Sequence, residues 1–353
     1  MSNPNADRLR VGFIGAGGIT RKRHAPGLLK IDDVELVAVC NRSLDSAQKF
    51  ARDFDIANVY DDWRQVVEDP LVDAVFIGTW PYKHSEYAIA ALDAGKHVFC
   101  QARLAMDASD ARRMVDKSIS TDRTTMVCPP PHGMYYRHKV REIVDGGHLG
   151  AIRHITVESF TGDNLDLDTD LHWRQRRDLS GLNTLTLGIM VEVVADWFNC
   201  QFASVQAVES TYVKQRLLYG QMSDVERPDS VFVLAEFSDG STGSLNFSSI
   251  AGGASDTTIS AYGTDGTLHY VAGPPDSEKG SMSFSKAPGW DIQEVEMSSV
   301  AAGGWTVEDE FIQAIRDGRN GVPSWETGME YMRVVEAVDV SARSGRRIFL
   351  DDV

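Results

Sequence analysis

The chain is short of positive charge and of cysteine, and it contains no long apolar run. Its 353 residues include 35 lysines and arginines against 51 aspartates and glutamates, which gives a net charge of −16. Nucleic-acid binding needs a basic footprint, so this balance argues against it. The longest apolar-biased run, Leu179 to Val191, falls short of the roughly 20 residues that cross a bilayer. No membrane partner is therefore expected.

Targeting signals and cysteine frameworks are missing as well. No basic segment followed by an apolar core opens the sequence, so no secretory signal is expected. The four cysteines are scattered without the spacing of a metal site or a disulfide framework: Cys40, Cys100, Cys128 and Cys200. Thiols of this kind are typical of buried residues in a reducing compartment. Together these absences predict a cytoplasmic protein.

The early part of the chain alternates apolar strands with amphipathic helical stretches. Helices are expected from about Thr20, over Asp45–Phe54 and over Ser85–Ala94. Strands are expected at Arg10–Ile14, Glu35–Cys40, Asp73–Gly78 and His97–Cys100. This order, with short connections, predicts an α/β domain with a doubly wound parallel sheet.

The later part of the chain has a different pattern, in which apolar and polar residues alternate with a period of two. Strands are expected at Ile152–Phe160, Ser204–Thr211, Ser230–Phe237, Ser241–Phe247, Thr257–Tyr262 and Thr267–Val271. We predict an α+β domain with a large, mostly antiparallel open sheet, whose exposed face would suit oligomerisation. The chain length favours two domains, and we place them at residues 1–124 and 125–353.

A glycine-rich turn lies between the first expected strand and the first expected helix. It reads Gly15-Ala16-Gly17-Gly18-Ile19-Thr20. Glycines in this position let the backbone approach a pyrophosphate at a helix N-terminus. Although Thr20 stands where the pattern has its third glycine, the context predicts dinucleotide binding, with Gly15, Gly17, Gly18 and Ile19 at the cofactor. The alternative is a tight turn in an unrelated α/β fold.

The end of the second expected strand bears on the choice between NAD and NADP. Asn41 stands where NAD-binding proteins commonly place an acid on the ribose hydroxyls, so no charge there would repel a 2′-phosphate. Arg42 and Ser43 can bind that phosphate. The sequence therefore favours NADP over NAD. NAD stays possible if Asn41 bonds the ribose and Arg42 is solvated.

Three further segments carry a resemblance to a known family. Gly95–Ala105, which reads GKHVFCQARLA, resembles the Gly-Lys-His-Val-x-x-Glu-Lys-Pro-Leu-Ala signature of the glucose-fructose oxidoreductase / inositol dehydrogenase / rhizopine catabolism (Gfo/Idh/MocA) family. Thr79–His84 is similar to its Thr-Pro-x-x-x-His loop, and His172–Arg174 contains its Trp-Arg pair. The resemblance implies a Rossmann domain followed by an α+β domain. It also implies cofactor contacts from Thr79, Trp80, His84, Gln101, Trp173 and Arg174.

The family's proton-handling residues are absent at the matching positions. Gln101 stands for the family's Glu, Ala102 for its Lys and Arg103 for its Pro. In its Asp-x-Gly-x-His-x-x-Asp pattern, Thr186 replaces the first Asp, Met190 the His and Val193 the last Asp. These three positions share one helical face. Glu192 and Asp196 are expected to point away from that face, solvated or salt-bridged.

Other residues are candidates for the lost role. Arg103 could steady an alkoxide or polarise a carbonyl, although it does not release a proton near neutral pH. His172 and Tyr136, and next to them His132, are candidate acids or bases, each with an alternative as a loop or core residue. The acidic loop Asp163–Asp170 lacks the glycine and glutamate of a calcium loop, which favours a solvated loop over a metal site.

The resemblance implies an NAD(P)-dependent oxidoreductase that acts on a sugar, a cyclitol or a derived carbonyl compound, with an atypical proton pathway. It also implies a homodimer or homotetramer formed through the C-terminal sheet. Two alternatives stay open because the lysine and histidine are missing. One is a catalytically silent cofactor-binding sensor or regulatory protein. The other is a lyase or hydrolase that oxidises its substrate transiently with tightly bound NAD(H).

Overall fold

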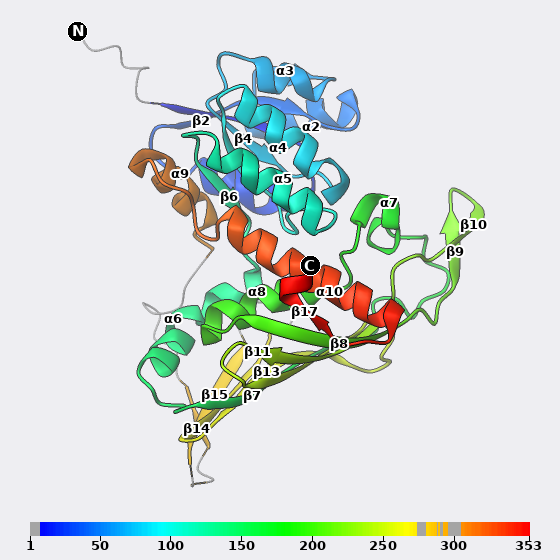
Figure 1. Ribbon diagram of the computed structural model, residues 1–353. Coiled ribbons are helices and arrows are strands. Elements are labelled where there is room, and N and C mark those ends of the chain that lie inside the picture. The colour runs from blue at the N-terminus through cyan, green and yellow to red at the C-terminus, as the bar shows by residue number, and fades with distance from the viewer. Residues whose placement is uncertain (1–7, 274–279, 288, 290–291, 296–304) are drawn as a thin grey trace. The chain divides into compact units, whose positions relative to one another are not determined.

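The computed structural model describes residues 8–273, 280–287, 289, 292–295 and 305–353 (Figure 1). The chain divides into two compact units. Unit 1 comprises the described residues up to Pro129 together with Thr306–Met329, and unit 2 comprises Pro130–Trp305 and Glu330–Val353. Each unit has its own sheet and its own core.

Unit 1 contains a six-stranded parallel sheet with the order β3-β2-β1-β4-β5-β6. This is the order of a doubly wound dinucleotide-binding fold, so the predicted fold class is confirmed. The strands are β1 (Leu9–Ile14), β2 (Val34–Cys40), β3 (Asn58–Tyr60), β4 (Ala74–Ile77), β5 (His97–Cys100) and β6 (Thr125–Val127). Near-continuous burial of β1, β2, β4 and β5 reflects a sheet covered on both faces.

Helices alternate with these strands. They are η1 (Thr20–His24), α1 (Ala25–Leu28), α2 (Leu44–Phe54), α3 (Trp63–Glu68), η2 (Pro81–Lys83), α4 (His84–Asp93), α5 (Ala108–Ile119) and α9 (Val307–Asp317). Ser43, Asp62 and Asp107 accept backbone N–H groups at the starts of α2, α3 and α5, which satisfies donors that a helix leaves unpaired. The helix η1 is a π-helix, directly after the glycine turn.

The division into two compact units differs in two respects from the boundary predicted after residue 124. β6 is the last strand of the first sheet, so unit 1 extends to Pro129. The segment Thr306–Met329 also returns to unit 1, because α9 packs Phe311 edge-on against Phe76 and Phe99 at centroid distances of 5.3 and 5.6 Å. A contact so distant along the chain leaves no local pattern in the sequence.

Unit 2 contains a nine-stranded sheet with the order β16-β15-β14-β13-β7-β12-β11-β8-β17. β12 and β7 are parallel, and the other pairs are antiparallel. The strands are β7 (Ile152–Thr161), β8 (Phe202–Ser210), β11 (Ser230–Phe237), β12 (Thr242–Ser248), β13 (Ser255–Gly263), β14 (Gly266–Val271), β15 (Ser281–Lys286), β16 (Ile292–Glu294) and β17 (Ile348–Phe349). The predicted antiparallel sheet is confirmed, with three short strands beyond those expected.

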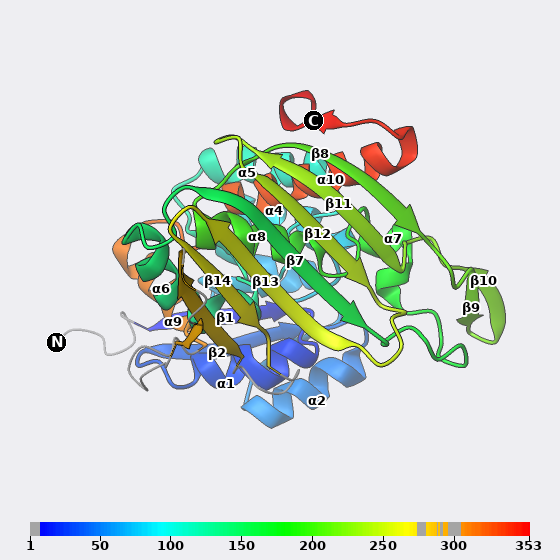
Figure 2. The ribbon, with the colours of Figure 1, turned by 90° about the horizontal axis from the view of Figure 1, so that it is seen from below.

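The rest of unit 2 consists of helices and one separate hairpin, β9 (Gln215–Leu218) with β10 (Gln221–Asp224). The helices are α6 (Pro131–Asp145), η3 (Trp173–Gln175), α7 (Arg177–Ser180), α8 (Leu187–Phe198), α10 (Trp325–Ser344), whose first residues belong to unit 1, and η4 (Leu350–Asp352). Within unit 2, α6 and α8 lie behind the sheet in Figure 2, and the strands face the viewer. Among the described residues, no helix is both long and apolar enough for a membrane crossing.

Candidate functional site

The site expected in unit 1 is built from the loops that follow β1, β2, β4 and β5. In a parallel sheet these carboxyl ends meet at one edge, where nucleotides bind. Gly15 has a φ of +86°, and a Cβ there would lie 2.6 Å from Thr79 Cγ2. Glycine is therefore required at Gly15 both by conformation and by the close approach of the loop after β4.

Gly17 and Gly18 have the opposite environment. A Cβ built at either residue meets no atom of the described residues within 4 Å, its chain neighbours aside, so the described part of the chain leaves space above this part of the turn. The turn is also rigid, since the Gly17 N–H donates to the Gly15 carbonyl at 2.9 Å and the Gly15 N–H donates to the Cys40 carbonyl at 2.9 Å. An open and rigid backbone surface at the start of a helix fits a pyrophosphate.

The residues after β2 are partly engaged in holding the turn. Asn41 Oδ1 accepts the Ala16 N–H at 2.6 Å, a link between two predicted cofactor segments that the sequence pattern did not indicate. Ser43 caps α2 by accepting the Ser46 N–H at 3.4 Å. Arg42 is exposed, and its guanidinium carbon lies 5.5 Å from the centroid of the Trp80 ring. The structure therefore brings Arg42 and Trp80 together, as expected for one site.

Thr79, at the end of β4, presents an unusual polar atom. Its hydroxyl oxygen is buried and has no hydrogen-bond partner among the described residues. Buried hydroxyls normally have partners, and an unsatisfied one calls for an explanation such as a missing ligand. Because Thr79 also contacts the glycine turn, this hydroxyl supports a ligand at the carboxyl edge of the sheet.

His84 ties two of the loops together and has no exposed surface of its own. Its Nδ1 lies 3.1 Å from the carbonyl oxygens of Arg103 and Leu104, and its Nε2 lies 2.9 Å from the carbonyl oxygen of Thr79. Burial lowers the pKa of His84, against the opposing effect of these carbonyls. These contacts show that His84 positions the loops after β4 and β5, and the direct cofactor contact that the resemblance implied stays a prediction.

Gln101, the first residue after β5, belongs to a buried network that the sequence did not indicate. Its Oε1 lies 3.0 Å from Nε2 of His24, and Nδ1 of His24 lies 2.5 Å from Oε1 of Glu308. The side chains of His24 and Glu308 are 2% and 1% exposed. The network thus connects α9 to the strand end that carries the family signature, through η1.

Arg103 follows in the same segment, and the peptide bond between Ala102 and Arg103 is cis. The residue is buried, with 5% of its surface exposed, and its carbonyl faces His84. A cation held so far from bulk water interacts more strongly with a nearby negative charge than an exposed one. The proposed contact of Arg103 with a substrate oxygen stays a prediction.

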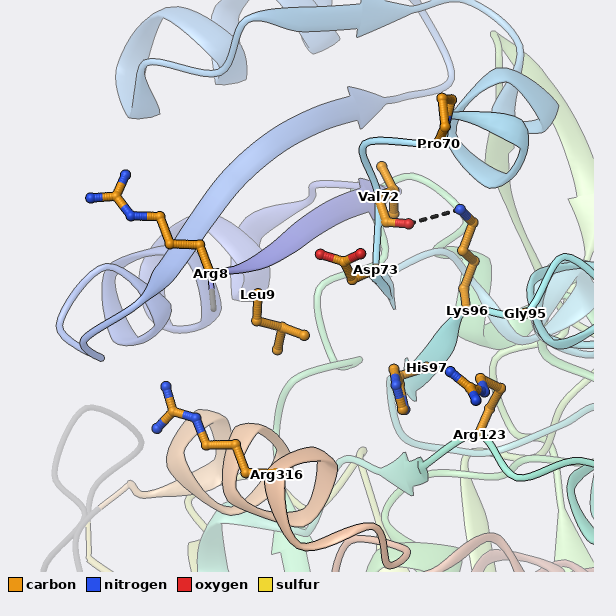
Figure 3. A pocket seen from close by; sticks show the side chains of 10 residues that line it. All are labelled: Arg8, Leu9, Pro70, Val72, Asp73, Gly95, Lys96, His97, Arg123 and Arg316. Atoms are coloured by element: carbon orange, nitrogen blue, oxygen red, sulfur yellow. Dashed lines mark hydrogen bonds between the residues drawn. The ribbon is translucent and has the colours of Figure 1, made fainter. Parts of the chain in front are cut away.

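The amino ends of the strands form the opposite edge of this sheet and carry a cavity of about 420 Å³. No sequence pattern indicated this cavity. It is lined by Arg8, Leu9, Pro70, Val72, Asp73, Gly95, Lys96, His97, Arg123 and Arg316 (Figure 3). None of these residues belongs to the predicted cofactor site.

In unit 2, His172–Arg174 forms a compact turn. His172 Nδ1 accepts the Arg174 N–H at 3.3 Å, and the Arg174 guanidinium carbon lies 4.4 Å from the centroid of the Trp173 ring. His172 and Arg174 are exposed. Partial desolvation, followed by the charge of Arg174, lowers the pKa of His172. The imidazole is therefore neutral near pH 7, which is the form that can accept a proton.

Tyr136, the other expected acid or base, lies on α6 and is 5% exposed. Its hydroxyl donates to the Gly280 carbonyl, and its ring packs edge-on against Tyr270 at a centroid distance of 5.3 Å. These contacts correspond to the core alternative for Tyr136. The side chain of His132, considered beside it, lies outside the described residues.

On α8, the prediction that Glu192 and Asp196 are solvated or salt-bridged is confirmed for Asp196 and is wrong for Glu192. Met190 and Val193 are 1% and 2% exposed. Asp196 is salt-bridged, since its carboxylate accepts two hydrogen bonds from Arg137 at 2.6 and 2.8 Å. Glu192, expected to be solvated or salt-bridged, is instead buried with 6% exposed and forms no ion pair with a described residue. Burial, and then the charge of Asp196, raises its pKa well above the usual value.

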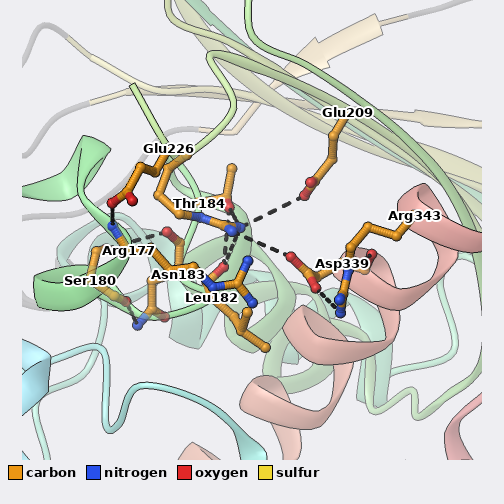
Figure 4. A network of polar contacts seen from close by, with 10 residues as sticks. Arg177, Ser180, Leu182, Asn183, Thr184, Glu209, Glu226, Asp339 and Arg343 are labelled. Atoms are coloured by element: carbon orange, nitrogen blue, oxygen red, sulfur yellow. Dashed lines mark hydrogen bonds and ion pairs between the residues drawn. The ribbon is translucent and has the colours of Figure 1, made fainter. Parts of the chain in front are cut away.

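The segment before α8 is held by buried Arg227, whose partners Leu182, Thr184, Glu209 and Asp339 are labelled in Figure 4. Arg227 donates to the Leu182 carbonyl at 2.9 Å and to the Thr184 hydroxyl. It also pairs with Asp339 of α10 at 3.3 Å and lies 4.0 Å from Glu209 of β8. Arg227 therefore fixes the entry to the helix on which the family places its acid–base groups.

The acidic loop Asp163–Asp170 is exposed at all of its aspartates. Buried Arg216 holds this loop by donating hydrogen bonds to the carbonyls of Asn164 and Asp166. No cluster of three or more metal-ligating side chains occurs in the described part of the chain.

Comparisons with known proteins agree with this arrangement. A model of the oxidoreductase family with an NAD-binding Rossmann fold (GFO_IDH_MocA) matches residues 9–128, and a model of the GFO/IDH/MocA C-terminal domain matches residues 138–269. Levoglucosan dehydrogenase from Pseudarthrobacter phenanthrenivorans is 26% identical over 74% of this chain and 73% of its own. Inositol 2-dehydrogenase from Pseudomonas fluorescens is 31% identical over 46% of this chain and 52% of its own. The chain thus spans about half the length of several curated relatives that it matches.

Solved structures show the same fold. An oxidoreductase domain protein from Kribbella flavida superposes with a TM-score of 0.88 at 23% identity, covering 97% of this chain and 99% of that one. Levoglucosan dehydrogenase in complex with NADH superposes with a TM-score of 0.85 at 22% identity, with the same coverage.

Proposed function

Since the chain belongs to the Gfo/Idh/MocA family of oxidoreductases, we propose that it is an NAD(P)-dependent oxidoreductase with an altered proton pathway. The observation that carries the proposal is the open backbone at Gly17 and Gly18, beside the unpartnered hydroxyl of Thr79. Gly15, Gly17, Gly18 and Ile19 would hold the pyrophosphate. The nicotinamide, when bound, supplies the hydride chemistry, and the protein orients the reactants.

We infer NADP as the preferred cofactor, with NAD as the alternative. Arg42 is exposed at the carboxyl edge, and Asn41 places no negative charge beside it. A guanidinium is well suited to a 2′-phosphate. Asn41 Oδ1 is already engaged by the turn, which leaves its amide N–H groups for a ribose hydroxyl. The other cofactor contacts that we propose come from Ser43, Trp80, Gln101, Trp173 and Arg174.

The substrate class follows from the relatives. Levoglucosan dehydrogenase and inositol 2-dehydrogenase, by their names, act on an anhydrosugar and a cyclitol. We propose a sugar, a cyclitol or a derived carbonyl compound for this chain. Turnover of the ordinary substrates glucose and myo-inositol should be slow, because losing a general acid–base typically costs about 10²–10⁴-fold. Rapid oxidation of either compound would show that another residue handles the proton efficiently.

For the proton pathway we propose Arg103 as the group that polarises a substrate oxygen and His172 as the first candidate for the base. Tyr136 is the weaker candidate, because its hydroxyl is committed to a carbonyl. Arg103→Ala should lower kcat/KM without changing the Kd of NADPH, and His172→Gln should flatten the acid limb of the pH–rate profile. An unchanged profile in His172→Gln would remove His172 from the pathway.

The decisive test of the proposal is dinucleotide binding by Gly17→Val. The protein has room for the new side chain, so the clash falls on the cofactor, and the Kd should rise by about 100-fold or more, a loss near 3 kcal/mol. Nicotinamide fluorescence would follow binding of NADH and NADPH, and an unchanged melting temperature would serve as the folding control. Failure of the wild-type protein to bind either dinucleotide contradicts the proposal.

The missing lysine and histidine keep the silent sensor as the second candidate, because Ala102 and Met190 carry no ionisable group. The double variant Ala102→Lys/Met190→His separates the two functions. Dehydrogenation on a panel of sugars and cyclitols, absent in the wild type but gained by this variant, would indicate a silent protein with an open substrate pocket. Turnover by the wild type without net NAD(P)H formation would instead support the transient-oxidation lyase or hydrolase.

A further inference from the structure

The amino edge of the unit 1 sheet gathers cations from separate parts of the chain. Arg8 precedes β1, Lys96 precedes β5, Arg123 precedes β6, and Arg316 lies in the last turn of α9. All four line the cavity of about 420 Å³. In a chain with a net charge of −16, such a concentration of positive charge is local and needs its own explanation.

The single carboxylate among the lining residues is already neutralised. Asp73 Oδ2 accepts the Arg10 N–H and Nε–H, each at 2.9 Å, and Oδ1 accepts from Nη2 at 2.8 Å. Burial raises the pKa of Asp73, but the hydrogen bonds from Arg10, and then the charge of Arg10, outweigh burial and lower the pKa below its usual value. The Arg10–Asp73 pair carries no net charge, and Arg123 is likewise paired with Asp122, so the uncompensated positive charge of the lining residues lies on Arg8, Lys96 and Arg316.

Lys96 and Arg123 are held by hydrogen bonds within the protein, and each still has N–H groups that could bind a ligand. Lys96 Nζ donates to the carbonyls of Val72 at 2.7 Å and Asp69 at 2.9 Å (Figure 3), which uses two of its three N–H groups. Arg123 donates from Nε and Nη2 to Asp122 at 2.8 and 2.6 Å, which leaves Nη1. These contacts pre-order the side chains before a ligand arrives.

The other two cations are more exposed. Arg8 has no hydrogen bond or ion pair with a described residue, and Arg316 donates from Nη2 to the Asp32 carbonyl at 2.7 Å. His97 adds a neutral donor. Its Nδ1 accepts the Thr124 N–H at 3.0 Å, so the ring proton lies on Nε2. Burial lowers the pKa of His97 to about 4, and the imidazole stays neutral at physiological pH.

We propose that this cavity is a second ligand site, for a small phosphate ester such as a phosphorylated sugar. Its volume is within the range of small-molecule sites, and its lining combines guanidinium and ammonium groups with a neutral N–H donor, which are groups that bind the oxygens of a phosphate monoester. The site is at the amino ends of the strands, on the order of 13–20 Å along the sheet from the glycine turn. It is therefore separate from the cofactor site and does not depend on the proposed function.

Calorimetric titration tests the site, with glucose 6-phosphate and inorganic phosphate as probes and glucose as the neutral control. Each titration is run with and without a saturating concentration of NADPH. We expect saturable binding of glucose 6-phosphate that weakens with salt and is not competed by glucose or by NADPH. The double variant Arg8→Ala/Arg316→Ala should lose at least tenfold in affinity.

The matched control is Arg113→Ala, which removes an exposed arginine of α5 that does not line the cavity and should leave the affinity unchanged. All variants should melt at the wild-type temperature, because the substituted residues are exposed. The proposal is overturned by the absence of saturable binding up to 10 mM probe, by competition from NADPH, or by equal affinity of the wild type and the double variant.

Discussion

Arg42 and Trp80 place a cation beside a large aromatic ring at the carboxyl edge of the first sheet, with 5.5 Å between the guanidinium carbon and the ring centroid. The ring restricts where the guanidinium can lie, as cation–π contacts do. We propose that this arrangement directs Arg42 to the 2′-phosphate of NADP, without contact to a pyrophosphate bound at the glycine turn.

We therefore expect Arg42→Ala to weaken NADPH binding by about 1–3 kcal/mol, the range of a charged hydrogen bond, and to leave NADH binding nearly unchanged. Fluorescence titration of both cofactors measures the difference. Lys49→Ala, on the exposed surface of α2, is the control for a general loss of positive charge. Equal losses of the two cofactors would show that Arg42 does not recognise the phosphate.

Glu192 is the residue at which a pH effect on stability is expected. Its pKa is raised in the folded protein, mainly by burial. The acid form is therefore favoured by folding, and its stabilisation is complete below the unfolded pKa near 4.5 and is lost as pH rises through the folded pKa. Each unit by which the folded pKa exceeds the unfolded pKa lowers the free energy of unfolding by about 1.4 kcal/mol once the pH is above both pKa values.

Glu192→Gln should consequently be more stable than the wild type at pH 8, with a difference that shrinks towards pH 4. Urea unfolding across this pH range measures it. Asp196→Asn is the comparison, because it removes the neighbouring charge and breaks the Arg137 pair at the same time. A constant difference between wild type and Glu192→Gln at all pH values would mean that the pKa of Glu192 is the same in the folded and the unfolded protein.

The sequence could not predict the burial of Glu192, and the reason lies in the surroundings of α8. Helical periodicity places Glu192 away from Met190, and an amphipathic helix would expose it there. Yet α8 is buried on nearly all sides, from Leu187 to Phe198. Where a helix has no solvent face, the angle between two side chains no longer indicates which of them is exposed.

At the scale of elements, α9 stabilises the start of the first sheet. Glu308 of α9 pairs with His24 of η1, and both side chains are almost fully buried. Removing the Glu308 side chain takes away the buried hydrogen bond between its Oε1 and Nδ1 of His24, and the loss of such a bond typically costs about 1–3 kcal/mol. Glu308→Ala should lower the free energy of unfolding by this amount, as measured by denaturant titration.

Asp309→Asn on the same helix is the matched control, because Asp309 is exposed and should change stability by less than about 1 kcal/mol. Similar losses for the two variants would indicate a general effect of charge near the start of α9. Because His24 also contacts Gln101, Glu308→Ala should weaken dinucleotide binding as well, even though Glu308 lies outside the predicted cofactor segments.

Most elements could be predicted from local patterns, whereas their partners could not. The glycine turn and the strands β1, β2, β4 and β5 follow from apolar runs and turn residues, which act over a few positions. The short strands β9, β10 and β17 have too few residues for a period to be visible. The role of His84 depends on carbonyls near residues 79 and 103, and such tertiary contacts leave no periodic trace.

At the scale of the whole molecule, one face of the nine-stranded sheet is buried in the core of unit 2, and the other face is exposed. The exposed face carries Phe232 and Leu234 of β11, Val208 of β8 and Tyr262 of β13, which are 43%, 65%, 62% and 44% exposed. Phe232 pairs directly with Val208 in the register. Neighbouring apolar side chains on one sheet face are typical of an association surface, and on this basis we propose the homodimer or homotetramer that the resemblance implies.

Leu234→Lys should therefore shift the protein towards monomer, because it introduces a charge into an apolar contact. Analytical ultracentrifugation over a range of concentrations measures the shift. Glu158→Lys, on the same face at an exposed polar position of β7, is the control for charge alone. A wild-type protein that stays monomeric at all concentrations would rule out self-association through this face.

The division of unit 1 into two segments affects how the protein is made. A ribosome releases the six strands of the first sheet long before it reaches residue 306, yet Phe311 and Glu308 complete the core of that sheet. While residues 130–305 are synthesised, the first segment of unit 1 therefore lacks the side chains of α9 that cover part of its core. The first 129 residues alone are consequently a poor choice for an excised domain, and a minimal version of it has to join them to Thr306–Met329.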